Sequence, residues 1–143
     1  MLLVTKDRAG KLRECLTSLL RCRGMSASRL YAVQDGSHEP TAAVLREFGV
    51  PFVQRHGLAV DGGSRIAQHY GYAFKHFFRT ADTRSPAVIV IEDDFIFSPD
   101  FVEYFEAAAP LLDKDPSLWL VSAWNDNGFD DAVRARGRSP PPD

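Results

Sequence analysis

The stretch Ala87–Asp100, AVIVIEDDFIFSPD, decides the fold class of this chain. Its five apolar residues, Ala87–Ile91, lead directly into three consecutive acids, Glu92, Asp93 and Asp94. A short continuous apolar run of this kind predicts a strand that is buried on both faces, as in a parallel sheet. The acids then stand at the carboxyl end of that strand.

The acidic triplet predicts a site for a divalent cation. Three carboxylates at the end of a buried strand repel one another and are costly to bury without partners. A cation is the simplest compensation, and hard oxygen ligands suit Mg²⁺ or Mn²⁺ shared with substrate phosphates. Ligands of open α/β sheets also bind outside the carboxyl ends of the strands. The alternative is a solvated acidic strand end, since charged side chains mostly lie at the surface.

Strands and helices alternate along the rest of the chain. Besides Ala87–Ile91, the predicted strands are Leu2–Thr5, Arg29–Gln34, a short Pro51–Gln54 and Leu118–Ala123. The predicted helices are Lys11–Cys22, Thr41–Phe48, one from Ser64 after the loop Gly57–Gly63, and Pro99–Leu112 with Ser98 as N-cap. This alternation predicts an α/β fold with a mostly parallel sheet and helices on both faces.

Two of these helices have a recognisable apolar face. The first has a stripe at helical spacing, formed by Leu12, Cys15, Leu16, Leu19 and Leu20. Gly24 suits the end of that helix. In the helix from Ser64, the residues predicted to be buried are Ile66, Tyr70, Ala73, Phe74, Phe77 and Phe78.

Composition allows one domain and excludes some functions. The chain has 143 residues, is 45% hydrophobic and carries a net charge of −2, which gives no reason to propose nucleic acid as a partner. Cys15 and Cys22 stand two turns apart on one predicted helix, roughly 10 Å along its axis, too far for a disulfide. No run of about 18 apolar residues is present, so no membrane span is expected. The proline-rich residues 129–143 are expected to be a disordered tail.

Polar residues follow all the predicted strands except the short third. They are Asp7 and Arg8, Asp35 and His38, the acidic triplet, and Asn125 and Asp126. Carboxyl ends of parallel strands meet at one edge of a sheet, where a nucleotide-type ligand would bind. Neither GxGxxG after a strand nor GxxxxGK[ST] occurs, which disfavours dinucleotide oxidoreduction and P-loop hydrolysis.

Four segments of the chain resemble a known family. They are VTKDR from Val4, VQDGSHEPT from Val33, SRIAQHYGYAF from Ser64, and VIVIEDDF through WNDNG, which covers Val88–Gly128. They are similar to the β-1,2-N-acetylglucosaminyltransferases of the N-acetylglucosaminyltransferase I family, which also contains the protein O-mannose enzyme. The resemblance implies a GT-A, Rossmann-like nucleotide-sugar-binding fold over residues 1–128. It also implies Mn²⁺-dependent, inverting transfer of GlcNAc from UDP-GlcNAc to a mannose-terminated glycoprotein glycan in the Golgi lumen.

The resemblance also implies roles for single residues. Asp94 matches the acid that binds the metal, which in turn holds the UDP phosphates. Asp93 matches the acid facing the ribose, and Glu92 the one near the transferred sugar. The remaining matches are Arg8 with a phosphate-binding arginine, Asp35 with an aspartate that reads uracil, and His69 with a histidine beside the uracil.

Each of the last three has a structural alternative: an exposed helix start for Arg8, a turn former for Asp35 and a core histidine for His69. For His38 and Asp126 we favour structural roles, and for Trp124 a place in the core.

The family's acceptor region and general base have no match after Gly128, and the family's membrane anchor and stem are also missing. The catalytic base is therefore expected outside this chain, which would be a truncated, donor-binding N-terminal half. The alternative is a non-catalytic UDP-sugar- or metal-binding module, or an inactive truncated product.

Overall fold

A computed structural model describes residues 1–57, 62–81 and 87–124 of the chain. The chain divides into two compact units, Met1–Glu103 and Tyr104–Asp143. The first unit holds the sheet and most of the helices. The predicted boundary at residue 128 and the predicted tail lie outside the described residues.

The first unit is built on a parallel sheet, as the sequence predicts. Its strands are β1 (Leu2–Thr5), β2 (Tyr31–Asp35), β3 (Phe52–Arg55) and β4 (Val90–Glu92). Their order across the described sheet is β3-β2-β1-β4, and every pair is parallel. All carboxyl ends therefore lie at one edge.

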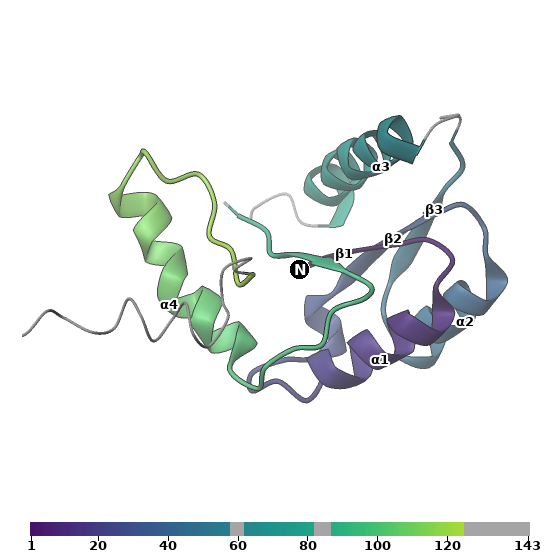
Figure 1. The fold of residues 1–143 in the computed structure, drawn as a ribbon, viewed down its shortest axis with the longest axis horizontal. Coiled ribbons are helices and arrows are strands. Elements are labelled where there is room, and N and C mark those ends of the chain that lie inside the picture. Colours follow the sequence, from purple (N-terminus) through teal and green to yellow (C-terminus); the bar gives the residue numbers. More distant parts are fainter. Residues whose placement is uncertain (58–61, 82–86, 125–143) are drawn as a thin grey trace, which may run out of the picture. The chain divides into compact units, whose positions relative to one another are not determined.

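Helices cover both faces of this sheet (Figure 1). Helices α1 (Ala9–Leu19) and α2 (Glu39–Glu47) lie on one face, and α3 (Gly62–His76) lies on the other. Short helical turns precede β2 at Ala27–Arg29 and continue α3 over Phe77–Ala81, and α4 spans Phe101–Lys114. The α/β fold class with helices on both faces is confirmed.

The core consists of two apolar layers, one on each side of the sheet. On the α1 and α2 side, the predicted stripe of α1 packs against Leu3 of β1, with Leu12, Cys15, Leu16 and Leu19 all buried. On the α3 side, Leu2 and Val4 pack with Ala73 and Phe77. Because β1 is buried on both faces, it holds the centre of the sheet and fixes where its end, Thr5, lies.

The start of the chain follows the sequence prediction in part. The strand Leu2–Thr5 has the predicted bounds. The helix after it covers Ala9–Leu19 instead of Lys11–Cys22 and has Leu20 as its C-cap, so Gly24, at φ +74°, lies in the turn that follows and does not end the helix. Both cysteines are buried and unbridged. Within residues 1–57, 62–81 and 87–124, none of the helices has the length and apolar content that a membrane crossing needs.

The strand before the acids differs from its prediction. It covers Val90–Glu92 instead of Ala87–Ile91, and only Ile91 is fully buried. The reason is position: β4 stands at an edge of the described sheet, so one of its sides has no strand neighbour there. The expectation of a strand buried on both faces was wrong.

Two predictions for the helices were also wrong in part. Ile66 of α3 is 62% exposed, and Phe78 in the turn that continues α3 is exposed as well. The sheet is covered instead by Ala73 of α3 and Phe77 of that turn. Helix α4 begins at Phe101, and Ser98 accepts the hydrogen bond of the Phe101 N–H through its carbonyl, so Ser98 closes a turn before the helix.

In the second unit, the predicted strand Leu118–Ala123 is wrong. The segment begins with a turn, in which the Leu118 N–H donates to the Asp115 carbonyl, and pairs with no strand in the described part of the chain. A strand needs a neighbour's backbone groups, and here the Ser122 carbonyl accepts from the Tyr104 hydroxyl instead. Trp124, expected in the core, is 66% exposed.

Candidate functional site

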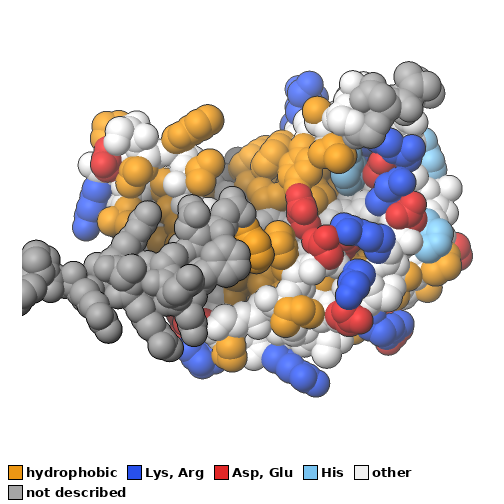
Figure 2. Space-filling model, in the orientation of Figure 1, with side chains coloured by type: hydrophobic (Ala, Val, Ile, Leu, Met, Phe, Trp, Pro, Cys, Tyr) orange, Lys and Arg blue, Asp and Glu red, His pale blue; other side chains and the backbone are white. Residues whose placement is uncertain are grey.

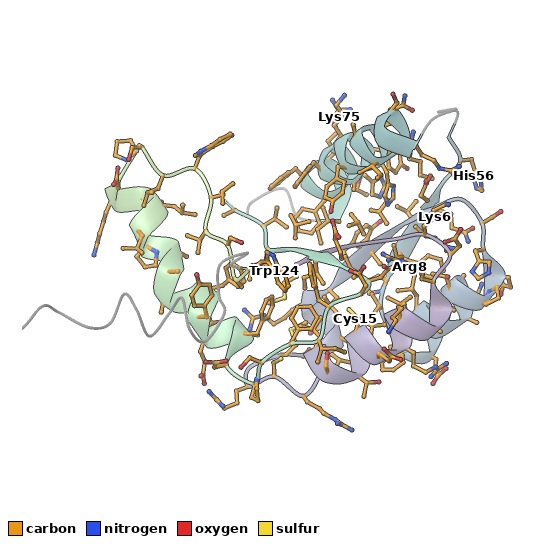
Figure 3. All side chains as sticks on the ribbon, viewed as in Figure 1. Lys6, Arg8, Cys15, His56, Lys75 and Trp124 are labelled. Carbon is orange, nitrogen blue, oxygen red and sulfur yellow. The ribbon has the colours of Figure 1, made fainter. Side chains whose placement is uncertain are left out.

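A cavity of about 340 Å³ lies at the carboxyl edge of the sheet, between the strand ends and α3. Its lining residues are Val4, Thr5, Lys6, Asp7, Arg8, Asp35, Arg65, Ile66, His69, Tyr70, Glu92 and Asp93. Figure 3 shows Lys6 and Arg8 where β1 ends, and Figure 2 shows acidic and basic side chains interleaved on that side of the molecule. The predicted gathering of polar strand ends is thus present for β1, β2 and β4.

Asp93 is the most deeply placed of the three acids. Its side chain is 2% exposed, and its Oδ2 accepts from the Thr5 hydroxyl at 2.6 Å. Its Oδ1 accepts from Nη2 of Arg8. The register explains the first contact: Val4 pairs with Glu92, so the next residues, Thr5 and Asp93, stand side by side. The carboxylate is therefore fixed by β1 as much as by its own strand.

Arg8 joins two of the acids. Its Nη1 donates to Asp94 Oδ2 at 2.8 Å while Nη2 holds Asp93. Arg8 is also the N-cap residue of α1, so its predicted site role and its alternative as a helix-start residue describe the same position. Asp94 remains accessible, with its side chain 37% exposed.

Glu92 has one contact with a residue of α3 and one with a residue of α1. The Tyr70 hydroxyl donates to Glu92 Oε1, and burial together with this carboxylate raises the pKa of Tyr70. Tyr70 thus stays a donor. The Cys15 thiol lies 3.5 Å from the Glu92 carbonyl, and burial raises the pKa of Cys15 to about 12, so this cysteine is a packing residue and not a nucleophile.

These contacts change the argument for a cation. Each acid of the triplet already has a partner from the chain: Tyr70 for Glu92, Thr5 and Arg8 for Asp93, and Arg8 for Asp94. Charge compensation alone therefore does not demand a metal ion. Among residues 1–57, 62–81 and 87–124, no group of three or more His, Cys, Asp or Glu side chains is arranged as metal ligands.

The residues nevertheless fit a divalent cation at Asp94. Mg²⁺-like ions are often held by one or two carboxylates together with substrate phosphates, and Asp94 offers an accessible hard oxygen ligand. Asp93 does not, because Thr5 and Arg8 already hold its buried oxygens. The predicted division of roles, with Asp94 alone on the metal, is compatible with this arrangement.

Asp35 is placed at the end of β2 between two arginines. Its side chain is 5% exposed, and its Oδ2 accepts from Arg65 Nε at 2.6 Å. Its Oδ1 lies 3.7 Å from Arg55 Nη1, and both of these buried atoms lack a hydrogen bond within the described residues. A Cβ on Gly57 would lie 2.6 Å from Arg55 Nη2, so the glycine leaves room for this guanidinium.

His69 lies on the inner face of α3 and is buried. Neither of its ring nitrogens has a hydrogen-bond partner among the residues that the structure describes, although it lines the cavity. Burial lowers the pKa of His69; Asp35 opposes this effect and Arg55 adds to it. Backbone groups of Val33 and Thr5 also favour the charged form of His69. A site residue and a core histidine held by the backbone of β1 and β2 therefore both stay predictions.

The structure adds three residues that the sequence analysis did not name as site residues: Thr5, Tyr70 and Arg65. Thr5 could have been found from the strand register, and Arg65 from its place four residues before His69 on the helix. Tyr70, predicted only as a buried residue, directly follows His69, so helical spacing around His69 does not indicate its site contact. His38 lies outside the cavity lining and hydrogen-bonds Thr41 through Nδ1 at 2.9 Å, which suits the predicted structural role. Asp126 lies outside the described residues.

Fold and site together define a parallel α/β domain with a carboxylate-rich cavity at the ends of its strands. The chain belongs to the GNT-I family, which matches residues 1–139. It is similar to the alpha-1,3-mannosyl-glycoprotein 2-beta-N-acetylglucosaminyltransferase of Arabidopsis thaliana, with 32% identity over 134 residues. That match covers 85% of this chain and 30% of the relative, so the chain spans less than a third of the relative's length.

The burial of His69 predicts how stability depends on pH. Because the folded state lowers the pKa of His69 below its ordinary value of 6.5, the unfolded chain binds more protons as the pH falls through that region. The free energy of unfolding should therefore decrease on acidification from about pH 7.5 to about pH 5.5. Urea denaturation across this range measures it. His69→Gln should flatten the dependence, and an unchanged slope in this variant would contradict the prediction.

Proposed function

We propose that this chain is the donor-binding part of an N-acetylglucosaminyltransferase that acts in N-glycan processing. The donor would be UDP-GlcNAc, and the acceptor a terminal mannose of a glycoprotein glycan. Transfer would proceed with inversion and depend on Mn²⁺, and the Golgi lumen is the compartment that we propose. The similarity to the Arabidopsis N-acetylglucosaminyltransferase supports the sugar and the acceptor class.

One observation carries the proposal. Arg8, Asp35, His69, Glu92 and Asp93, predicted as site residues from separate segments, line one cavity at the strand ends. A nucleoside diphosphate needs cationic donors for its phosphates and a small number of placed polar groups for its base. Arg8 supplies a fork of donors at one part of the cavity, and Asp35 and His69 supply unused buried polar atoms at another.

The metal would be held by Asp94, as the resemblance implies. When bound, Mn²⁺ would stabilise the negative charge of the departing diphosphate. The chain's own residues orient the donor: Arg8 binds phosphate oxygens, and Asp93 stays fixed by Thr5 toward the ribose. Tyr70 holds one oxygen of Glu92 and leaves the other for the sugar.

Calorimetric titration of the purified chain tests this function. We expect UDP to bind in Mn²⁺ and to bind much more weakly in a chelator. We also expect CDP to bind more weakly than UDP, because cytosine lacks the ring N–H that Asp35 would accept. Losing such a bond typically costs about 1–3 kcal/mol. Equal affinities for UDP in Mn²⁺ and in chelator would refute the metal assignment, and equal affinities for UDP and CDP the uridine assignment.

A further inference from the structure

Arg65 is a polar residue of the cavity to which the proposed function gives no role. It lies in the first turns of α3, with its side chain 39% exposed, and lines the cavity next to Asp35. Its one hydrogen bond within the described residues runs from Nε to Asp35 Oδ2. A guanidinium has five N–H donors, so the terminal nitrogens of Arg65 have donors to spare.

The contact between Arg65 and Asp35 is one-sided. A carboxylate and a guanidinium usually pair through two parallel hydrogen bonds, but here Asp35 Oδ1 has no hydrogen-bond partner among the described residues. A buried carboxylate oxygen without a partner is uncommon and calls for a ligand or water. This oxygen is buried and lies 3.7 Å from Arg55 Nη1. The pair lines one wall of the cavity, where Asp35 supplies a carboxylate acceptor and Arg65 supplies donors on its terminal nitrogens.

This pattern matches one edge of a uracil ring. Uracil has a ring N–H between two carbonyl oxygens, so a donor stands directly beside an acceptor. We propose that Arg65 donates a hydrogen bond to a uracil carbonyl while Asp35 accepts from the adjacent N–H, which makes Arg65 a specificity residue for the base. The inference rests on the proposed binding of a uridine nucleotide.

Cytosine fits this pair less well than uracil does. Its ring nitrogen is an acceptor, so the buried Asp35 carboxylate would face a lone pair, which is how polar sites reject near-isosteres. If Arg65 contacts the carbonyl at C4, it would also face the exocyclic amino group of cytosine, whereas the carbonyl at C2 is the same in both bases. Asp35 lies within ion-pair distance of both Arg65 and Arg55, so two cations fix the position of this carboxylate.

The test compares UDP with analogues in which sulfur, a weaker acceptor, replaces one carbonyl oxygen. Affinities for UDP, 2-thio-UDP, 4-thio-UDP and CDP are measured by calorimetry in Mn²⁺ for the wild-type chain, for Arg65→Met and for Arg46→Met. Arg46 is a matched control because it is an exposed arginine paired with a carboxylate, Glu39, on α2 and lies outside the cavity lining. Circular dichroism confirms that each variant is folded.

For the wild type and Arg46→Met, we expect one thio analogue to bind about tenfold more weakly than UDP. In Arg65→Met, UDP should bind about tenfold more weakly, and the penalty for that analogue should disappear. If Arg65→Met weakens UDP but keeps the penalty, Arg65 acts only through Asp35 and the inference is overturned. An equal loss for UDP and CDP with the penalty kept would make Arg65 a phosphate contact and overturn it too. Equal binding of UDP and CDP by the wild type would instead refute the proposed function itself.

Discussion

Replacing Asp94 by alanine is expected to abolish the effect of Mn²⁺ on UDP binding and to weaken UDP binding in Mn²⁺ by about 100-fold or more. Residues that merely support a metal ligand are worth about 10–100-fold in metal affinity, and a ligand itself should be worth at least as much. Asp94 is the acid that Arg8 leaves accessible, whereas Asp93 is buried. Calorimetric titration of UDP, with Mn²⁺ and with chelator, measures the effect.

Glu47→Ala is the matched control for this variant. Glu47 forms an exposed ion pair with Arg13, as Asp94 does with Arg8. Neither carboxylate is itself a lining residue, but the partner of Asp94, Arg8, lines the cavity, whereas Glu47 lies at the end of α2 and its partner Arg13 does not. We expect the control to bind UDP as the wild type does. Arg8 keeps its contact with Asp93 when Asp94 is removed, so phosphate binding in chelator should change little. A variant that keeps its response to Mn²⁺ would place the metal elsewhere.

The sequence predicts the sheet well because the apolar runs of its central strands can be recognised within each segment alone. In β1, Leu2, Leu3 and Val4 are apolar and buried, and the stripe of α1 repeats at helical spacing. Leu118–Ala123 looks equally strand-like, yet a strand also depends on a neighbour, and that information is not local to the segment. The expectation that Trp124 lies in the core was wrong for the same reason.

The candidate site also has one part that the sequence predicts and another that depends on tertiary packing. The carboxyl ends of the strands can be predicted from the sequence, and in a parallel sheet they lie at one edge. The shared location of Arg8, Asp35 and the acidic triplet could therefore be predicted from topology alone. Which side chain partners which acid could not be predicted, because Tyr70 and Arg65 reach the cavity from the far side of the sheet through the packing of Ala73 and Phe77. Only the tertiary position of α3 provides those contacts.

Replacing Gln34 is expected to have the second large effect, a decrease in the free energy of unfolding. Its side chain is fully buried in β2, and its Nε2 donates to the carbonyls of Lys6 at 3.2 Å and His38 at 2.8 Å. It therefore ties the loop after β1 to the loop after β2 at the edge that forms the cavity. Its Oε1 accepts from Gln54 Nε2 at 3.2 Å, so the amide uses both its donor and its acceptor side.

Gln34→Leu should lower the free energy of unfolding by about 2–3 kcal/mol, because a buried group that loses its partner costs about 1–3 kcal/mol. The His38 carbonyl keeps the Ala42 N–H as a donor, so the loss falls mainly on Lys6 and Gln54. Urea denaturation measures the change. Since Lys6 lines the cavity, UDP affinity should fall as well, even where the variant remains folded.

Gln54→Leu separates this network from a general effect of the substitution. Gln54 is half-buried on the neighbouring strand β3 and contributes one hydrogen bond to Gln34, so its replacement should lower the free energy of unfolding by about 1 kcal/mol or less. It contacts neither loop carbonyl, and UDP affinity should stay near that of the wild type. If both variants lowered stability and UDP affinity equally, the loss would arise from placing leucine in this part of the sheet, and the two carbonyl contacts of Gln34 would not be what holds the cavity edge together.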